Sequence, residues 1–164
     1  MLKSPKNLGI IHFIGIGGIG MSGIAEILFQ SGYQVQGSDL NKSNNTNRLE
    51  SLGIKIYIGQ KKSNIVNAKI IVVSTAISET NEEFLAAKKM FLPIVHRSEM
   101  LGELMRLKQS IAIAGTHGKT TTTSLIAKMV EENGMDPTII NGGIISSLDS
   151  NARLGNGEWM IVEA

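Results

Sequence analysis

The stretch 110–124 constrains this chain most, because an apolar run stops there at a turn bracketed by two glycines and gives way to a row of hydroxyl side chains. The run 111–114 is short, apolar and rich in isoleucine, which is typical of a buried parallel strand. From Lys119 onward the apolar spacing is helical. We expect one helix face to carry Leu125, Ile126, Met129 and Val130. A strand that enters a helix through Gly115 and Gly118 leaves the first N–H groups of the helix free to bind an anion.

The side chains of this turn fit a nucleoside triphosphate. Lys119 supplies a positive charge for the β- and γ-phosphates, and the Thr120 hydroxyl is placed to bind Mg²⁺. Ile113 stands where the common G-x-x-x-x-G-K-[ST] loop has its first glycine, so the motif is the shorter G-x-x-G-K-T. A tight turn without a ligand would not explain a lysine and a threonine at these positions. We predict ATP binding by Gly115, Thr116, His117, Gly118, Lys119, Thr120 and Thr121.

A second glycine turn lies near the N-terminus. The apolar run 8–16 leads into G-x-G-x-x-G over 15–20, and the helix expected after it ends at Gly32. The next predicted strand, 34–38, ends at Asp39, where a dinucleotide fold has the acid that binds ribose hydroxyls. This order of elements favours a nucleotide site. The alternative is a glycine turn selected only for close packing.

Alternating strands and helices follow this turn. Further strands are predicted at 54–58, 68–74, 93–96, 138–141 and 159–162, and helices from the cap signals Asn47-x-x-Glu50 and Thr80-x-x-Glu83 and over 98–107. The loop 75–78 leaves the carboxyl end of a strand, where open α/β sheets bind ligands, although a plain connection explains it equally well. The pattern predicts an α/β fold. We expect a Rossmann-like, doubly wound parallel sheet over 1–108, and the incomplete start of a P-loop α/β ATPase domain over 109–164.

Composition excludes several classes of function. Sixteen basic and fourteen acidic residues give a net charge of only +2 without a basic block, so we expect no nucleic-acid or membrane partner. Cysteine is absent, which excludes disulfides, thiolate metal sites and cysteine nucleophiles. No stretch approaches membrane-spanning length and no signal peptide fits the N-terminus, so we expect a cytoplasmic protein.

Motifs along the whole chain resemble the Mur ligase family. They are Ile11-His-Phe-Ile-Gly-Ile-Gly-Gly-Ile-Gly-Met-Ser-Gly-Ile-Ala-Glu26, Gly37-Ser-Asp39, Arg97-Ser-Glu-Met-Leu101, Ala114-Gly-Thr-His-Gly-Lys-Thr-Thr-Thr-Thr123, Asp136-Pro-Thr138 and Asn141-Gly-Gly143. The short phosphate loop with Thr116-His117 is typical of that family. The form of 15–21 resembles the branch that adds L-alanine. The resemblance implies three domains, of which this chain holds the first and the opening of the second.

The resemblance also implies a ligand and a reaction. It implies that the N-terminal turn binds the diphosphate of a UDP-sugar, not NAD, through Gly15, Gly17, Gly18, Ile19, Gly20, Met21, Asp39, Thr75 and Ala76. It implies ATP-dependent, ADP-forming ligation of L-alanine to UDP-N-acetylmuramate through an acyl phosphate, in peptidoglycan precursor synthesis. Lys119 and Glu163 are then catalytic, with Thr120 and Glu163 as Mg²⁺ ligands.

Two alternatives to this reaction stay open. One is an NAD-dependent oxidoreductase or nucleotide-sensing module built on the N-terminal glycine turn. It leaves Lys119 and Thr120 unexplained. The other is a non-catalytic fragment that keeps UDP-sugar binding, because we expect the 164 residues alone to be inactive as a ligase.

Overall fold

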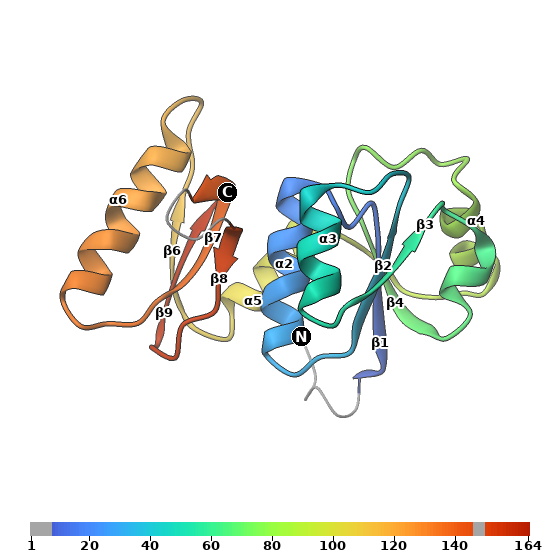
Figure 1. Ribbon diagram of the computed structural model, residues 1–164, viewed down its shortest axis with the longest axis horizontal. Coiled ribbons are helices and arrows are strands. Elements are labelled where there is room, and N and C mark those ends of the chain that lie inside the picture. Colours follow the sequence, from blue (N-terminus) through green and yellow to red (C-terminus); the bar gives the residue numbers. More distant parts are fainter. Residues whose placement is uncertain (1–7, 146–149) are drawn as a thin grey trace.

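The computed structural model describes residues 8–145 and 150–164, so the first seven residues of the predicted range 1–108 and residues 146–149 of 109–164 lie outside it. Two β-sheets lie side by side with helices around them (Figure 1). The first sheet has the order β3-β2-β1-β4-β5, and every neighbouring pair is parallel. Its strands are β1 (Ile10–Ile14), β2 (Val35–Asp39), β3 (Lys55–Ile58), β4 (Ala68–Val73) and β5 (Ile94–His96). The predicted parallel α/β fold is therefore confirmed.

Helices cover both faces of the first sheet. They are α2 (Ile19–Gln30), α3 (Asn44–Ser51), the 3₁₀ helix η1 (Lys62–Ile65), α4 (Glu82–Lys89) and α5 (Arg97–Met105). Residues of α2, α3 and α5 share one hydrophobic core with β1 and β2, whereas η1 and α4 pack into a second core on the other face. Burial on both faces explains why the central strands β1 and β4 are largely hydrophobic runs.

Two predicted helix starts are wrong. Helix α3 begins at Asn44, where the Ser43 hydroxyl accepts from the N–H of Thr46 and the Thr46 hydroxyl accepts from the N–H of Ser43. The predicted cap Asn47 lies inside this helix. Helix α4 is capped by Asn81 rather than by Thr80. Both segments hold several residues able to cap, and packing of the helix on the sheet decides which one does.

The second sheet has the order β6-β9-β7-β8. Its strands are β6 (Gln109–Ile113), β7 (Thr138–Ile145), β8 (Ser150–Arg153) and β9 (Trp159–Glu163). Three are parallel, and β8 runs antiparallel to β7. We did not predict β8, because Ser-Asn-Ala-Arg has no apolar alternation. Strand β7 is longer than predicted, since it continues through Gly142 and Gly143.

Helix α6 (Lys119–Glu132) covers one face of the second sheet. Two of the four apolar residues that we expected on its buried face are exposed instead. Leu125 and Met129 are 61% and 65% exposed. Thr123 and Ala127 are buried instead, and Ile126 and Val130 pack against the core of this sheet. The four predicted positions span a broad arc of the helix, and only one side of that arc meets the sheet.

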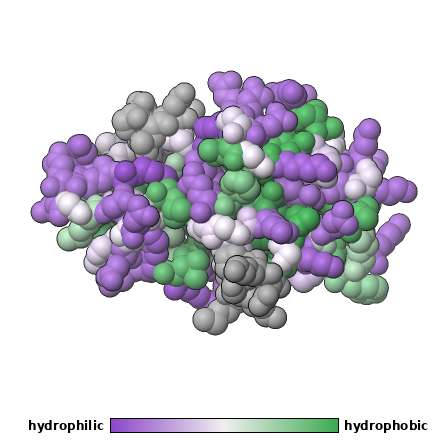
Figure 2. Space-filling view, turned by 60° about the horizontal axis from the view of Figure 1, so that its bottom comes forward, coloured by the Kyte–Doolittle hydropathy of each residue, from purple (hydrophilic) through white to green (hydrophobic). Residues whose placement is uncertain are grey.

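Helix α2 lies between the two sheets and packs on both (Figure 1). Its Ile24 and Leu28 share a core with β1, β2 and, from the second sheet, Ile140, Ala152 and Val162. The described part of the second sheet is therefore covered on both faces, by α6 and by α2. On the face drawn in Figure 2, hydrophobic patches are separated by hydrophilic side chains. No described helix is long and apolar enough to cross a lipid bilayer.

Candidate functional site

The N-terminal glycine turn is held against the end of β2. Gly15 has a φ of +77°, a conformation that a side chain would strain. The N–H groups of Gly15 and Ile16 both donate to the carbonyl oxygen of Ser38, at 2.8 and 2.9 Å. The N–H of Gly17 donates to Asp39 Oδ2 at 2.8 Å. Hydrogen bonds to β2 and to the Asp39 carboxylate at its end therefore hold the turn in place without a ligand.

The two helices that start at glycine turns differ from the other described α-helices. Helices α3, α4 and α5 are capped by the side chains of Ser43, Asn81 and His96. Helices α2 and α6 follow Gly18 and Gly118, have no side-chain cap and carry no acidic residue in the first turn. Their first N–H groups and the positive ends of their dipoles are thus available to an anion.

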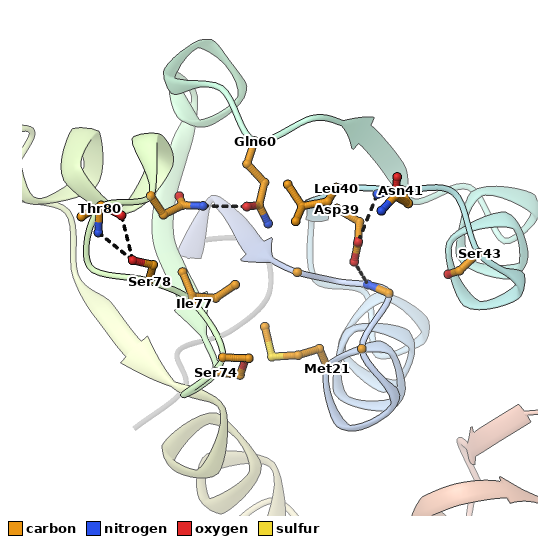
Figure 3. Close-up of a pocket in the computed structure, with 15 residues that line it drawn as sticks. Met21, Asp39, Leu40, Asn41, Ser43, Gln60, Ser74, Ile77, Ser78 and Thr80 are labelled. Carbon is orange, nitrogen blue, oxygen red and sulfur yellow. Dashed lines mark hydrogen bonds between the residues drawn. The ribbon is translucent and has the colours of Figure 1, made fainter.

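A cavity of ≈ 550 Å³ lies beside the N-terminal turn (Figure 3). Of the residues predicted to bind the UDP-sugar, it is lined by Gly15, Gly17, Gly18, Met21, Asp39 and Ala76. Thr75 is not among its lining residues. Ile77 and Ser78 also line the cavity, and they belong to the loop 75–78 that the sequence marked as a candidate ligand-binding strand end. Sequence reasoning missed Leu40, Asn41, Ser43, Gln60, Ser74, Thr80 and Asn81. These residues follow strand ends or precede helices, so their position at the carboxyl edge of the sheet was the only available signal.

Asp39 takes part in the turn itself. Besides accepting from the N–H of Gly17, its carboxylate lies where a Cβ on Gly17 would come within 2.8 Å of Oδ2. Such a Cβ would also meet Thr46 and Ser43. The absence of a side chain at Gly17 is therefore required by this packing as well as by any ligand. Binding of ribose hydroxyls by Asp39 stays a prediction.

A buried polar network fixes the opposite wall of this cavity. The Glu83 carboxylate, fully buried, accepts from the Ser38 hydroxyl at 2.5 Å and from Asn64 Nδ2 at 2.6 Å, and lies 3.4 Å from His12 Nε2. These bonds attach the start of α4 to the sheet. Asn81, at that start, donates to Gln60 Oε1 at 2.6 Å, and both side chains line the cavity.

A second cavity, of ≈ 320 Å³, connects the N-terminal turn to the second sheet. Its lining includes Gly18, Ile19, Gly20 and Met21 from the start of α2, Gly142 from the middle of β7, and Glu163 and Ala164 from the end of β9. Ser74 and Arg97 complete it. Predicted residues of both sites are thus brought together here. Arg97 was noticed in the sequence as part of a motif but was not assigned to a site.

The phosphate loop 114–120 joins β6 to α6. Gly118 has a φ of +74°, and Lys119 Nζ donates to the carbonyl oxygen of Gly115 at 2.9 Å across the loop. The Thr120 hydroxyl donates to Glu163 Oε2 at 2.8 Å. Thr116, His117 and Thr121 are exposed. The structure therefore groups Lys119, Thr120 and Glu163 around the start of α6 and leaves the middle of the loop open to solvent.

The grouped oxygen atoms fit Mg²⁺ better than a transition metal. A hydroxyl and a carboxylate are hard donors, and Mg²⁺ in nucleotide sites uses one or two such protein ligands together with water and phosphate oxygens. The described residues contain no group of three or more His, Cys, Asp or Glu able to hold a metal ion. Thr120 and Glu163 could thus hold Mg²⁺ only together with a phosphate-bearing ligand.

Comparisons with known proteins find a matching family and similar sequences. Residues 10–109 match the family described as "Mur ligase family, catalytic domain"; the phosphate loop lies beyond the matched range. The chain is 60% identical over its whole length to a UDP-N-acetylmuramate–L-alanine ligase of Parvibaculum lavamentivorans, and 58% identical over 99% of its length to one of Mesorhizobium japonicum. It spans 33% and 35% of those proteins, about a third of their length.

Two solved structures share the fold. The crystal structure of UDP-N-acetylmuramate-alanine ligase from Thermotoga maritima has a TM-score of 0.88 and 35% identity, covering 94% of this chain and 36% of that one. The UDP-N-acetylmuramate:L-alanyl-γ-D-glutamyl-meso-diaminopimelate ligase from Neisseria meningitides has a TM-score of 0.88 and 29% identity, covering 96% of this chain and 52% of that one.

Proposed function

This chain belongs to the Mur ligase family, and we propose that it forms the sugar-nucleotide-binding and ATP-binding part of a ligase that joins L-alanine to UDP-N-acetylmuramate. Relatives carrying that name are 60% and 58% identical to it and about three times as long. The reaction therefore belongs to the whole protein. This chain contributes two of its binding sites.

We assign the sugar nucleotide to the N-terminal turn. The uncapped start of α2 at Gly18 would bind the diphosphate, since free N–H groups and the helix dipole both favour an anion there. The ≈ 550 Å³ cavity, between Asp39 and the loop at Ala76, would hold the uridine. The loop 74–81 supplies backbone and short polar groups, which suit recognition of a nucleoside.

We assign ATP to the phosphate loop. The uncapped start of α6 would bind its phosphates, with Lys119 neutralising the β- and γ-phosphates and Thr120 and Glu163 holding Mg²⁺. When bound, Mg²⁺ supplies charge neutralisation for phosphoryl transfer. The chain's own part is to position the γ-phosphate and to stabilise its charge, which is most of what this class of reaction requires.

The observation that carries the proposal is the ≈ 320 Å³ cavity lined both by the start of α2 and by Glu163. A sugar nucleotide whose diphosphate lies at α2 can extend its lactyl carboxylate through this cavity toward the ATP site. That carboxylate would take the γ-phosphoryl group, and the amine of L-alanine would displace phosphate from the acyl phosphate. An amide forms and ADP and phosphate are released.

We propose two domains with a boundary near Lys108. Residues 1–108 would be the UDP-sugar-binding domain and 109–164 the opening of the ATP-binding domain. The change of sheet between β5 and β6 supports this division. The shared core around α2 means that the two parts still pack as neighbours.

The test is titration calorimetry of this chain with UDP-N-acetylmuramate and with NADH in parallel. We expect saturable binding of the sugar nucleotide and none of NADH. The reverse result would favour the alternative of an oxidoreductase or nucleotide-sensing module. L-Alanine-dependent phosphate release by a protein of the relatives' full length tests the ligation itself.

A further inference from the structure

We propose that Arg97 binds an anionic group of the sugar nucleotide where that ligand passes from the N-terminal turn toward Glu163. The inference rests on the proposed function, because it concerns the same ligand. It adds a residue that neither the motif analysis nor the pattern of glycines assigned to a site. Arg97 is the first residue of α5 and lines the ≈ 320 Å³ cavity.

The guanidinium of Arg97 lies against the first turn of α2. A Cβ built on Gly20 would come within 2.5 Å of Arg97 Nη1 and 3.1 Å of Cζ. Gly20 therefore leaves the space that the guanidinium occupies. This places a positive charge beside the helix start that is proposed to bind the diphosphate.

Within the described ranges, the side chain of Arg97 has no carboxylate partner, unlike those of the other three arginines. Arg48, Arg106 and Arg153 each form an ion pair with a carboxylate. The side chain of Arg97 makes no such ion pair and no hydrogen bond with any described residue. Glu163 lines the same cavity but is bonded to Thr120 and to the N–H of Gly142 instead. The fold thus holds an unpaired, half-buried guanidinium in a cavity.

An anion resolves this arrangement. The positive end of the α2 dipole and a guanidinium repel each other when nothing lies between them, and both attract an oxyanion placed in the cavity. A guanidinium can donate two parallel hydrogen bonds to a phosphate or to a carboxylate. UDP-N-acetylmuramate carries both groups, the diphosphate and the lactyl carboxylate, and either has the required chemistry.

The experiment compares Arg97→Met with the parent chain by calorimetry, using UDP-N-acetylmuramate and UDP-N-acetylglucosamine. The second ligand keeps the diphosphate but lacks the lactyl carboxylate. Loss of a charged hydrogen bond predicts a roughly tenfold to hundredfold weaker binding of UDP-N-acetylmuramate. An equal loss for both ligands identifies the diphosphate as the group bound, and a loss confined to UDP-N-acetylmuramate identifies the carboxylate.

Two further variants control for the fold and for total charge. Arg106→Met removes an exposed arginine at the end of the same helix and should leave both affinities unchanged. Arg97→Gln removes the charge but keeps a polar side chain at this half-buried position, and should weaken binding in a chain that still unfolds cooperatively; it decides the matter if Arg97→Met does not fold.

The outcomes separate this inference from the proposed function. If the parent chain binds and Arg97→Met, or Arg97→Gln in its place, keeps both affinities within about twofold, the inference about Arg97 is wrong and the proposed function stands. If the parent chain binds neither ligand, the proposed function is itself wrong.

Discussion

The hydroxyl of Thr120 donates a 2.8 Å hydrogen bond to Glu163 Oε2, and this bond joins the start of α6 to the end of β9 across 43 residues of sequence. The same carboxylate oxygen accepts from the N–H of Gly142 in the middle of β7, also at 2.8 Å. A Cβ on Gly142 would come within 2.6 Å of the Glu163 carboxyl carbon. Glycine at this position therefore lets the start of α6 and the middle of β7 meet at the carboxylate that ends β9.

Glu163→Gln removes the negative charge of this side chain but keeps its size and shape. Glutamine can still accept from Thr120 and Gly142, so the free energy of unfolding should change by less than about 1 kcal/mol. Mg²⁺ prefers a charged oxygen ligand, so Mg²⁺-dependent binding of ATP should weaken at least about tenfold. Calorimetry with ATP in the presence and absence of Mg²⁺ measures this in the full-length protein. An unchanged Mg²⁺ dependence would remove Glu163 from the metal site.

Lys119→Ala should nearly abolish ligation in a protein of full length. Removing one positive charge from a phosphoryl-transfer site costs about 2 kcal/mol or more of transition-state stabilisation, roughly a hundredfold in rate. The fold should survive, because the Lys119 side chain donates, among the described residues, only to the Gly115 carbonyl of an exposed loop. Lys128→Ala, at an exposed position on the same helix, is the matched control. Turnover within a few-fold of the parent would contradict the assignment of Lys119.

Gly17→Ala tests the N-terminal turn. Its new Cβ would lie 2.8 Å from Asp39 Oδ2, so the carboxylate must move and the turn with it. Binding of UDP-N-acetylmuramate should weaken far more than binding of ATP. Gly102→Ala is the control, because a Cβ there meets nothing within 4 Å, and it should stabilise α5 by about 0.5 to 1 kcal/mol. Equal losses for both ligands would mean that the two sites are not separate.

Much of the fold was predictable because local signals agreed with the tertiary structure. Strands β1 and β4 are largely apolar runs, and glycines with positive φ at Gly32 and Gly134 follow the helices α2 and α6. Strand β8 was missed, since it is stabilised by pairing with β7 and by contacts with α2 rather than by its own pattern. Burial of Thr123 in place of Leu125 likewise depends on where α6 meets its sheet.

The candidate site was predictable only where a motif encodes it. Both glycine turns combine backbone geometry with a helix start, and that combination is visible in sequence. The cavity walls at Gln60 and Asn81 come from loops distant in sequence, so only the folded chain brings them together. The place of Arg97 could not be predicted for the same reason. Its guanidinium fills the space beside Gly20 only because α5 packs on α2.

Stability in acid should depend on Asp136. The pKa of the Asp136 carboxyl is lowered, mainly by the hydrogen bond from the N–H of Asn156. Burial raises this pKa, whereas the side-chain amide of Asn156 and the charges of Arg153 and Lys108 lower it further. A lowered folded-state pKa contributes stability above the ordinary aspartate pKa of about 4, and this contribution is lost as the pH falls through the lowered value. Asp136→Asn should therefore be less stable than the parent at pH 7. The two should converge in strong acid.

Urea denaturation at a series of pH values measures this convergence. Glu132→Gln, an exposed carboxylate on α6, is the control and should follow the parent curve. A constant difference between Asp136→Asn and the parent at every pH would show that the loss comes from packing and not from the charge.

Asn151→Ala should loosen the second sheet from α2. Asn151, 2% exposed, donates to the Ile19 carbonyl at the start of α2 and accepts from the Ser22 hydroxyl and from Arg48 Nη2. Truncation leaves these buried partners of Asn151 incompletely bonded, at a cost of about 1 to 3 kcal/mol. Asn133→Ala, at the exposed end of α6, should change stability by less than about 0.5 kcal/mol.

Hydrogen exchange shows where the Asn151→Ala chain loosens. In the parent, amides of β9 should exchange about as slowly as those of β1, because β9 is paired on both sides and its Ile161 and Val162 are fully buried. In the variant, protection should fall in β7, β8 and β9 while β1 and β4 keep theirs, since the first sheet has its own core with α4. An equal loss of protection in both sheets would mean that the chain unfolds as one cooperative unit and that Asn151 does not set the interface between them.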